Sequence, residues 1–254
     1  EAAGGRDSGG AHPHPHGDSH HGTLTMRFED LTWMDVERYL EQDDRLMLVL
    51  GSTEQHATLS LLTDVKIPLA LADAASQQTG VLVAPPLNFG ASPYFLAYPG
   101  TLSLRISTLN AVVEDVIRSA AGYGFRRILV LNGHGGNMPA RVHLNDLINQ
   151  LPGLRLNWYD WWTSHYTEAV AERHNIKPTH ANWLEAFPFT LVEEPPVEPK
   201  VPPKVPSPIM DAKTAREVYG DGSFGGPYKV SDEIMHELFA AALEDILMLL
   251  KFGE

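Results

Sequence analysis

Leu46-Met47-Leu48-Val49-Leu50 and the segment directly after it, Gly51-Ser52-Thr53-Glu54-Gln55-His56, decide the fold of this chain. A short apolar run bounded by turn-forming residues is typical of a strand buried in a parallel sheet. The pattern recurs where Ile128-Leu129-Val130-Leu131 leads into Asn132-Gly133-His134-Gly135-Gly136-Asn137. Loops at the carboxyl ends of such strands build the sites of open α/β sheets, so we expect the two segments to meet over the sheet.

Strands alternate with helices along the rest of the chain. Apolar runs predict strands over 46–50, 81–84, 127–131 and 154–158, and helical patterns cover 31–40, 65–78, 108–123, 137–150 and 232–251. This alternation indicates βαβ units. We predict an α/β fold: a single-domain sandwich with a mostly parallel central sheet flanked by helices. The Pro-rich stretch 194–208 suits neither element and is predicted to be an extended arm, solvated or packed on a neighbouring subunit.

The first 25 residues differ in composition from the remainder. They are rich in Gly, Ser, Ala and Pro, with interspersed histidines at His12, His14, His16, His20 and His21. We predict that residues 1–25 form a disordered, weakly chelating His-rich tail, with metal capture as the alternative role. Residues 26–254 are predicted to form one α/β domain, since folds of this size often remain single.

Composition excludes several classes of function. The formal charge of -13 argues against nucleic acid or an anionic membrane as a partner. The absence of cysteine excludes disulfides, thiolate nucleophiles and Cys-based zinc sites. No apolar run approaches the roughly 20 residues needed to cross a bilayer. We expect a small-molecule substrate and a cytoplasmic location, with a periplasmic location as the alternative if the tail follows a cleaved signal.

Four ligand-type side chains follow the first and third predicted strands. Glu54 and His56 lie close enough in the chain to converge on one centre, and the two carboxylate oxygens of Asp64 could bridge two metals. His134 lies in a glycine-rich turn, where missing Cβ atoms allow close approach of the backbone. A lone histidine is more often structural, but this mixture of oxygen and imidazole ligands on two strand-end loops indicates a catalytic divalent metal.

Together with His180-Ala181, Glu185 and the Gly220-Asp221-Gly222 segment with Gly225, these motifs resemble the creatininase family of metal-dependent amidohydrolases, over about residues 27–251. The resemblance implies a creatininase-like α/β domain assembled into homo-oligomers, commonly hexamers. It also implies two divalent metal ions per chain: zinc, manganese or iron.

The resemblance also implies the role of each site residue. Glu54 and His134 should bind one metal and His56 the other, with Asp64 as the bridge. Creatininase has a metal-binding Glu where this chain has Gly136. Other branches of the family also lack that Glu and use a later one, which aligns with Glu185, so the resemblance implies Glu185 as the fifth ligand. His180 matches the family's proposed proton-transfer histidine and is the candidate general acid/base. The predicted catalytic residues are therefore His180 and Glu185.

The substrate pocket departs from the family pattern. Many members read Glu-Gln-His-Gly-Pro-His-Leu-Pro before the Asp, whereas this chain has Ala57-Thr58-Leu59-Ser60 and is one residue shorter. The second histidine is gone, which argues against creatinine itself as the substrate. The predicted substrate contacts are Gly135 and Gly136, through backbone N–H groups, and the aromatic residues Tyr94, Trp162 and Trp183. For the aromatic residues, packing in the core or at an interface is the alternative.

Three functions are consistent with these residues. The leading hypothesis is a hydrolase whose dinuclear metal centre activates water to cleave a C–N bond in a cyclic amide or related small molecule. The first alternative is hydrolysis of a lactone or a cyclitol-derived cyclic ketone, or deformylation, at the same centre. The second is a non-catalytic protein that binds metal or a small ligand.

Overall fold

A computed structural model describes residues 26–254, and the predictions for residues 1–25 lie outside the described part. At its centre is a four-stranded sheet of order β2-β1-β3-β4, in which every neighbouring pair is parallel. The strands are β1 (Arg45–Leu50), β2 (Leu82–Val83), β3 (Arg127–Asn132) and β4 (Arg155–Asp160). All four predicted strands and the α/β class are confirmed; β4 continues past its predicted end at Trp158.

The described residues also form α-helices before, between and after the strands. They are α1 (Trp33–Leu40), α2 (Thr63–Thr79), α3 (Ile106–Tyr123), α4 (Met138–Leu147), α5 (His165–His174), α6 (Ala212–Tyr219) and α7 (Asp232–Leu249). The predicted helix 137–150 is divided into α4 and a 3-10 turn, Ile148–Gln150, and Pro139 lies in its first turn as expected. Helices α5 and α6 were not predicted, because both are short and largely polar.

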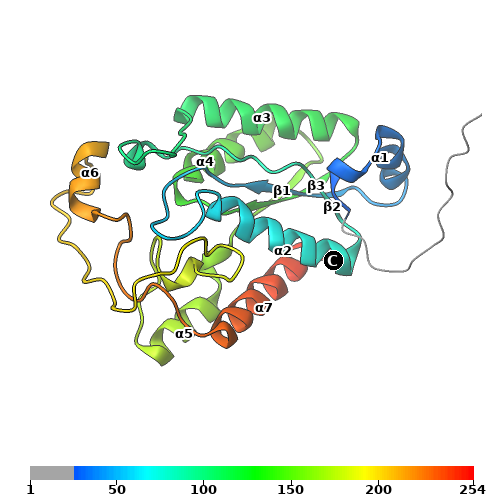
Figure 1. Cartoon of the computed structure of the whole chain (residues 1–254). Helices are drawn as coiled ribbons and strands as arrows, with labels where there is room; N and C mark the ends of the chain where they lie inside the picture. The colour runs from blue at the N-terminus through cyan, green and yellow to red at the C-terminus, as the bar shows by residue number, and fades with distance from the viewer. Residues whose placement is uncertain (1–25) are drawn as a thin grey trace, which may run out of the picture.

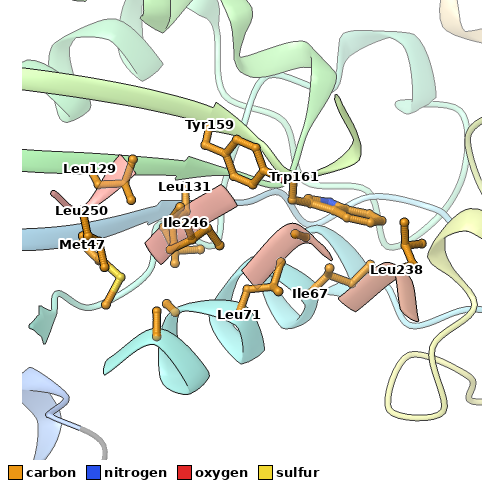
Figure 2. Packing of buried hydrophobic residues seen from close by; sticks show 14 of the residues in the cluster. Met47, Ile67, Leu71, Leu129, Leu131, Tyr159, Trp161, Leu238, Ile246 and Leu250 are labelled. Atoms are coloured by element: carbon orange, nitrogen blue, oxygen red, sulfur yellow. The ribbon is translucent and has the colours of Figure 1, made fainter. Parts of the chain in front are cut away.

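The helices cover both faces of the sheet (Figure 1). Alternate strand residues point to opposite faces. Met47 and Leu129 pack with α2 and α7, whereas Leu48 and Val130 pack with α3 and α4. Figure 2 shows Ile67 and Leu71 of α2 below the strands, in one cluster with Leu238 and Ile246 of α7. Each fully buried side chain of this kind stabilises the fold by about 1.5–3 kcal/mol.

The strand order explains where the site forms. The chain moves from β1 to β2 on one side and then returns to β3 on the other side of β1. Right-handed crossovers in opposite directions place their helices on opposite faces, and the loops separate between β1 and β3. This is the switch point where ligands bind in doubly wound sheets. The segments after Leu50 and Asn132 are the loops on either side of it.

The arm predicted over 194–208 contains no helix or strand in the described chain, apart from an isolated bridge between Lys200 and Gly226. Its valines Val197 and Val201 are strongly exposed. Among residues 26–254, no helix combines the length and the apolar character that crossing a membrane requires.

Candidate metal centre

The loop after β3 lies directly against the start of α2. The Gly133 N–H donates a hydrogen bond to the carbonyl of Leu50, at 2.8 Å, so the two strand-end loops leave the sheet together. A Cβ atom at Gly133 would lie 1.9 Å from the carbonyl oxygen of Asp64. Only glycine allows this approach, which brings Asp64 between the two loops.

The five predicted metal ligands converge at this point and are all buried: Glu54, His56, Asp64, His134 and Glu185. One oxygen of Asp64 lies 2.9 Å from His56 Nε2, and the other lies 3.0 Å from His134 Nδ1. Asp64 therefore belongs to two ligand groups, one completed by Glu54 and His134 and the other by His56 and Glu185. The structure brings the five predicted ligands together around Asp64, with Glu54 beside His134 as expected, and it adds that Glu185 lies in the group of His56.

In the rings of His56 and His134, one nitrogen contacts a backbone carbonyl and the other faces the centre. His134 Nε2 lies 2.8 Å from the carbonyl of Ala91, and His56 Nδ1 lies 3.1 Å from that of Glu54. A carbonyl oxygen can only accept a hydrogen bond, so each of these ring nitrogens must carry the proton and donate it. The opposite nitrogens, His134 Nδ1 and His56 Nε2, face the carboxylates and would be the ones to bind a metal, as in metal-bound histidines.

The donor set fits a divalent cation. Glu54 Oε2 and His56 Nε2 are buried without a hydrogen-bond partner among the described residues, although His56 Nε2 lies close to Asp64. A buried polar atom with no partner costs free energy, and a buried carboxylate costs more. Mixed imidazole and carboxylate ligands suit zinc and the other first-row divalent metals. A cation in each group would satisfy both atoms.

The pKa values of Glu54, His56 and His134 are all shifted toward the protonated form, which indicates that the centre favours added positive charge. Burial and the charge of Asp64 raise the pKa of Glu54 to about 7, against the opposing effect of His134 and His56. Burial lowers the pKa of His134, but the charge of Glu54 and the hydrogen bond to Asp64 outweigh it and raise the value to about 9. Burial also opposes protonation of His56, yet Asp64 and Glu185 raise its pKa well above the ordinary value.

A tight turn places Glu185 and His180 side by side. Ala181 has a φ of 53°, which is uncommon for a residue with a side chain, and its N–H donates to Glu185 Oε2 at 2.7 Å. The other oxygen of Glu185 lies 3.7 Å from His56 Nε2. His180 places Nδ1 3.7 Å from Glu54 Oε1, and burial and the charge of His56 lower its pKa well below the ordinary value.

The backbone excludes a ligand at the position of Gly136. A Cβ atom there would lie 2.0 Å from the carbonyl of Ala91 and 2.3 Å from His134 Nε2. A glutamate at this position would require both groups to move. A side-chain ligand at Gly136 is therefore excluded sterically, and the carboxylate of Glu185 lies instead in the group of His56 and Asp64.

A cavity of about 490 Å³ opens onto the centre. Its lining includes the predicted residues Tyr94, Gly135, Gly136, Trp162 and His180, together with metal-ligand candidates. The structure does not bring Trp183 into it. The Trp183 side chain is fully buried in the cluster between α2, α7 and the sheet, and its indole N–H donates to the carbonyl of Lys177.

Sequence reasoning missed several residues of the site. Phe95 and Phe224 line the cavity on two sides of His180, with Phe95 stacked on its ring at a centroid distance of 4.6 Å. Ser52 donates to Asp64, and Gln55 contacts His180. Ser52 and Gln55 lie in the first motif, so their polar side chains could have been recognised as part of the site from the sequence. The two phenylalanines lie far apart in sequence, and no sequence pattern linked them to the site.

Comparison with known proteins points to one family. The creatininase family model, described as creatinine amidohydrolase, matches residues 29–250. The chain is 36% identical to the creatinine amidohydrolase of Pseudomonas putida over 115 residues, which are 42% of this chain and 44% of that protein. It is 30% identical to the 3-dehydro-scyllo-inosose hydrolase of Thermotoga maritima over 138 residues, 52% of this chain and 44% of the relative.

A third relative is the mycofactocin precursor peptide peptidase of Mycolicibacterium smegmatis, 38% identical over 102 residues, which are 37% of this chain and 41% of the peptidase. These matches each span less than half the length of the curated relatives. A solved structure described as creatininase Mn has a TM-score of 0.74 and 20% identity, and covers 90% of this chain and 98% of that one. At this identity the likeness concerns the fold.

Proposed function

The chain belongs to the creatininase family, and from that membership we propose that it is a metal-dependent amidohydrolase that cleaves a C–N bond in a small cyclic amide. The observation that carries the proposal is the position of Asp64, whose two oxygens face different histidines. A carboxylate placed in this way can bridge two metals. We propose one ion on Glu54 and His134 and a second on His56 and Glu185, with zinc, manganese or iron as the metal.

Two such ions, when bound, lower the pKa of water and polarise a carbonyl group. The residues of the chain supply the rest. Gly135 and Gly136 line the cavity beside His134, where their backbone N–H groups can bind an oxyanion. His180 faces the centre through Nδ1 and lines the cavity, where it could contact a bound substrate. The aromatic walls present apolar surface to the bound substrate.

The cavity favours a small, neutral, flat substrate. Aromatic side chains line it from separate parts of the chain: Tyr94, Phe95, Trp162 and Phe224. Leu184 and Pro178 add apolar surface, and the lining residues in the described chain include no Lys or Arg. Apart from the proposed metals, a substrate with a carboxylate or phosphate would therefore find no cationic Lys or Arg side chain of residues 26–254 in the cavity. A ring that stacks on the aromatic walls and presents its carbonyl to the centre fits best.

A second candidate reaction has support of its own. The relative from Thermotoga maritima is a 3-dehydro-scyllo-inosose hydrolase, so hydrolysis of a cyclic ketone is compatible with a related chain. We propose this reaction, or lactone hydrolysis, as the alternative, because the same centre and the same apolar cavity serve each of them. Deformylation could use the same centre as well. The remaining alternative is a non-catalytic role in binding metal or a small ligand, for which the metal-ligand groups alone would be sufficient.

We also propose that the protein is a homo-oligomer, with a hexamer as the expected assembly. The exposed apolar residues Val197 and Val201 of the arm, and Ile209 directly after it, support the proposal, because their burial on a neighbouring subunit would be favourable. Sedimentation of the full chain tests it: a monomer at micromolar concentration would contradict it.

Metal content tests the proposed centre. The protein should be measured without residues 1–25, so that tail histidines do not contribute. We expect about two metals per chain, falling to about one in Glu185→Ala. Glu198→Ala is the matched control, because Glu198 lies exposed on the arm, and it should retain both metals. One metal or none in the unmutated protein would contradict the dinuclear centre.

Turnover of a substrate panel tests the reaction. Lactams, lactones, cyclic ketones, formylated amines and short peptide amides should be compared on the zinc- and manganese-loaded protein. We expect hydrolysis of a neutral lactam, abolished by Asp64→Asn. Turnover confined to lactones or ketones would support the alternative reaction. Two bound metals without turnover of any compound would favour the binding role.

A further inference from the structure

The side-chain amide of Gln55 has a fixed orientation. Its Oε1 accepts a hydrogen bond from the N–H of Ala57 at 3.1 Å, and its Nε2 donates to the carbonyl of Gly222 at 3.0 Å. Both partners are backbone groups, one of which can only donate and the other only accept. Exchanging the oxygen and nitrogen of the amide would break both hydrogen bonds, so the amide orientation is settled by its surroundings.

The second hydrogen of this amide points toward His180. Gln55 Nε2 lies 2.9 Å from His180 Nε2. Because an amide nitrogen only donates, His180 Nε2 must accept and carry no proton. The proton of the neutral imidazole then lies on Nδ1, the nitrogen that faces Glu54 and the cavity. A proton on Nε2 would set two donors against each other.

We propose that Gln55 is a positioning residue that holds His180 in the Nδ1–H tautomer, so that His180 acts as a fixed hydrogen-bond donor to the oxygen of the substrate. This role rests on the proposed function and differs from the proton transfer predicted from the sequence. To carry a proton, His180 would need either a free lone pair on Nδ1 or a second proton on Nε2. Gln55 disfavours both.

The same tautomer decides whether His180 binds metal. Glu54, His56 and His180 are close enough together to form a third ligand group. A histidine that binds through Nδ1 must have a lone pair there, and hence its proton on Nε2, against the amide of Gln55. The geometry therefore assigns His180 to the substrate and leaves the metals to the other ligands.

The chain holds Gln55 in place from a distant loop. A Cβ atom at Gly222, where φ is +100°, would lie 1.7 Å from Gln55 Oε1, so the loop reaches the amide only as glycine. Lys200 of the arm donates to the carbonyl of Ser223 at 2.7 Å and also pairs with Asp221. The arm thereby fixes the loop that presents the Gly222 carbonyl.

Nitrogen NMR of the histidine rings tests the tautomer without reference to activity. The full chain, labelled with ¹⁵N, should be recorded metal-free and zinc-loaded, with the His180 signals assigned by their loss in His180→Asn. We expect protonated Nδ1 and unprotonated Nε2 in both samples. In Gln55→Glu, which cannot donate in its ionised form, the proton should move to Nε2. A proton on Nε2 in the unmutated protein, or zinc on Nδ1, would overturn the proposal.

Glycine variants provide a test that leaves Gln55 unchanged. Gly222→Ala should displace the amide and move the His180 proton to Nε2, as in Gln55→Glu. Gly220→Ala is the matched control, because Gly220 also has a positive φ but has no atom within 4 Å of an added Cβ. We expect it to keep the tautomer of the unmutated protein. The same shift in both variants would overturn the role of the Gly222 contact.

Kinetics distinguish a hydrogen-bond donor from a proton carrier. The amide N–H of asparagine can replace the Nδ1–H of a histidine, whereas alanine cannot. With the substrate found by the panel, His180→Ala should lower kcat by roughly 10²- to 10³-fold, the effect of losing one oxyanion donor. His180→Asn should recover at least about tenfold of that loss. Equal activity of both variants would contradict the donor role, and an absence of any substrate would count against the proposed function while the NMR result still decides the tautomer.

Discussion

The hydroxyl of Ser52 donates a hydrogen bond to Asp64 Oδ2 at 2.7 Å, and both side chains are buried. This is the oxygen that also lies 3.0 Å from His134 Nδ1. The serine therefore orients the carboxylate that joins the two ligand groups. Hydrogen bonds of this kind to a metal-binding carboxylate typically affect metal affinity about 10- to 100-fold.

Ser52→Ala should weaken zinc binding by about tenfold, because Asp64 would lose the contact that holds its plane between the histidines. Competition with a chromophoric chelator measures the affinity. The matched control is Ser119→Ala, which removes an exposed hydroxyl bonded to a helix carbonyl and should leave the affinity unchanged. Equal affinity of Ser52→Ala and the unmutated protein would show that Asp64 is oriented by the metals alone.

Two adjacent glycines should respond differently to the same substitution. An added Cβ at Gly136 meets the Ala91 carbonyl and His134, whereas at Gly135 it meets nothing within 4 Å. Gly136→Ala should lower the free energy of unfolding by about 1–3 kcal/mol, the usual cost of overpacking. Gly135→Ala should change it by less than about 0.5 kcal/mol. Urea unfolding measures both, and equal effects would contradict the steric account of the missing ligand.

Stability should depend on pH through Asp43. Arg45 and Arg127 are paired in register at the starts of β1 and β3, and Asp43 lies 2.6 Å from the first and 3.6 Å from the second. Burial alone would raise the pKa of Asp43, but the hydrogen bonds and charge of Arg45, with the charge of Arg127, outweigh it and hold the pKa below its usual value.

Because the folded-state pKa is lowered, Asp43 stabilises the fold above the unfolded-state pKa of about 4, and this stabilisation is lost as the pH falls through the folded-state value. The difference in unfolding free energy between the unmutated protein and Asp43→Asn should therefore be constant near pH 7 and shrink below about pH 4. The exposed Asp30→Asn serves as the control. A difference that stays constant down to about pH 3 would contradict the ion-pair account.

The sequence predicted the sheet well because buried parallel strands have a simple signal, a continuous apolar run ended by turn residues. The α-helices that the sequence did not predict were two short ones, α5 and α6. Helix α5 is held by the Ser164 cap at its start and by Asn175 in the left-handed conformation at its end, and α6 by the Asp211 cap. Neither helix has an apolar stripe long enough to stand out, since each packs only partly on the rest of the fold.

The convergence of the proposed metal ligands was predictable for a different reason. Four of them follow β1 or β3 closely in sequence, and the switch point brings those two loops together. The contacts that tune the site could not be predicted in the same way. Gln55 receives its orientation from Gly222, 167 residues away, and a sequence pattern carries no information on such a pairing. Trp183 shows the converse: an aromatic residue beside a motif can be buried in the core.

Trp161 and Trp162 are neighbours in sequence with different surroundings, and they give the last prediction. Trp162 lines the cavity, whereas Trp161 is almost fully buried and packs edge-on against Phe187. Trp161→Ala should therefore lower the free energy of unfolding by about 3–5 kcal/mol, the usual cost of emptying a large core position.

Trp162→Ala removes a cavity wall, so it should raise KM for the substrate found by the panel by at least about tenfold, the equivalent of roughly 1.4 kcal/mol of lost binding. Because Trp162 also contacts the core, some loss of stability is expected, but less than for Trp161→Ala. Urea unfolding and steady-state kinetics on both variants measure the two effects. If Trp162→Ala lost stability and left KM unchanged, Trp162 would be a packing residue like its neighbour, and the aromatic wall of the site would consist of Tyr94, Phe95 and Phe224.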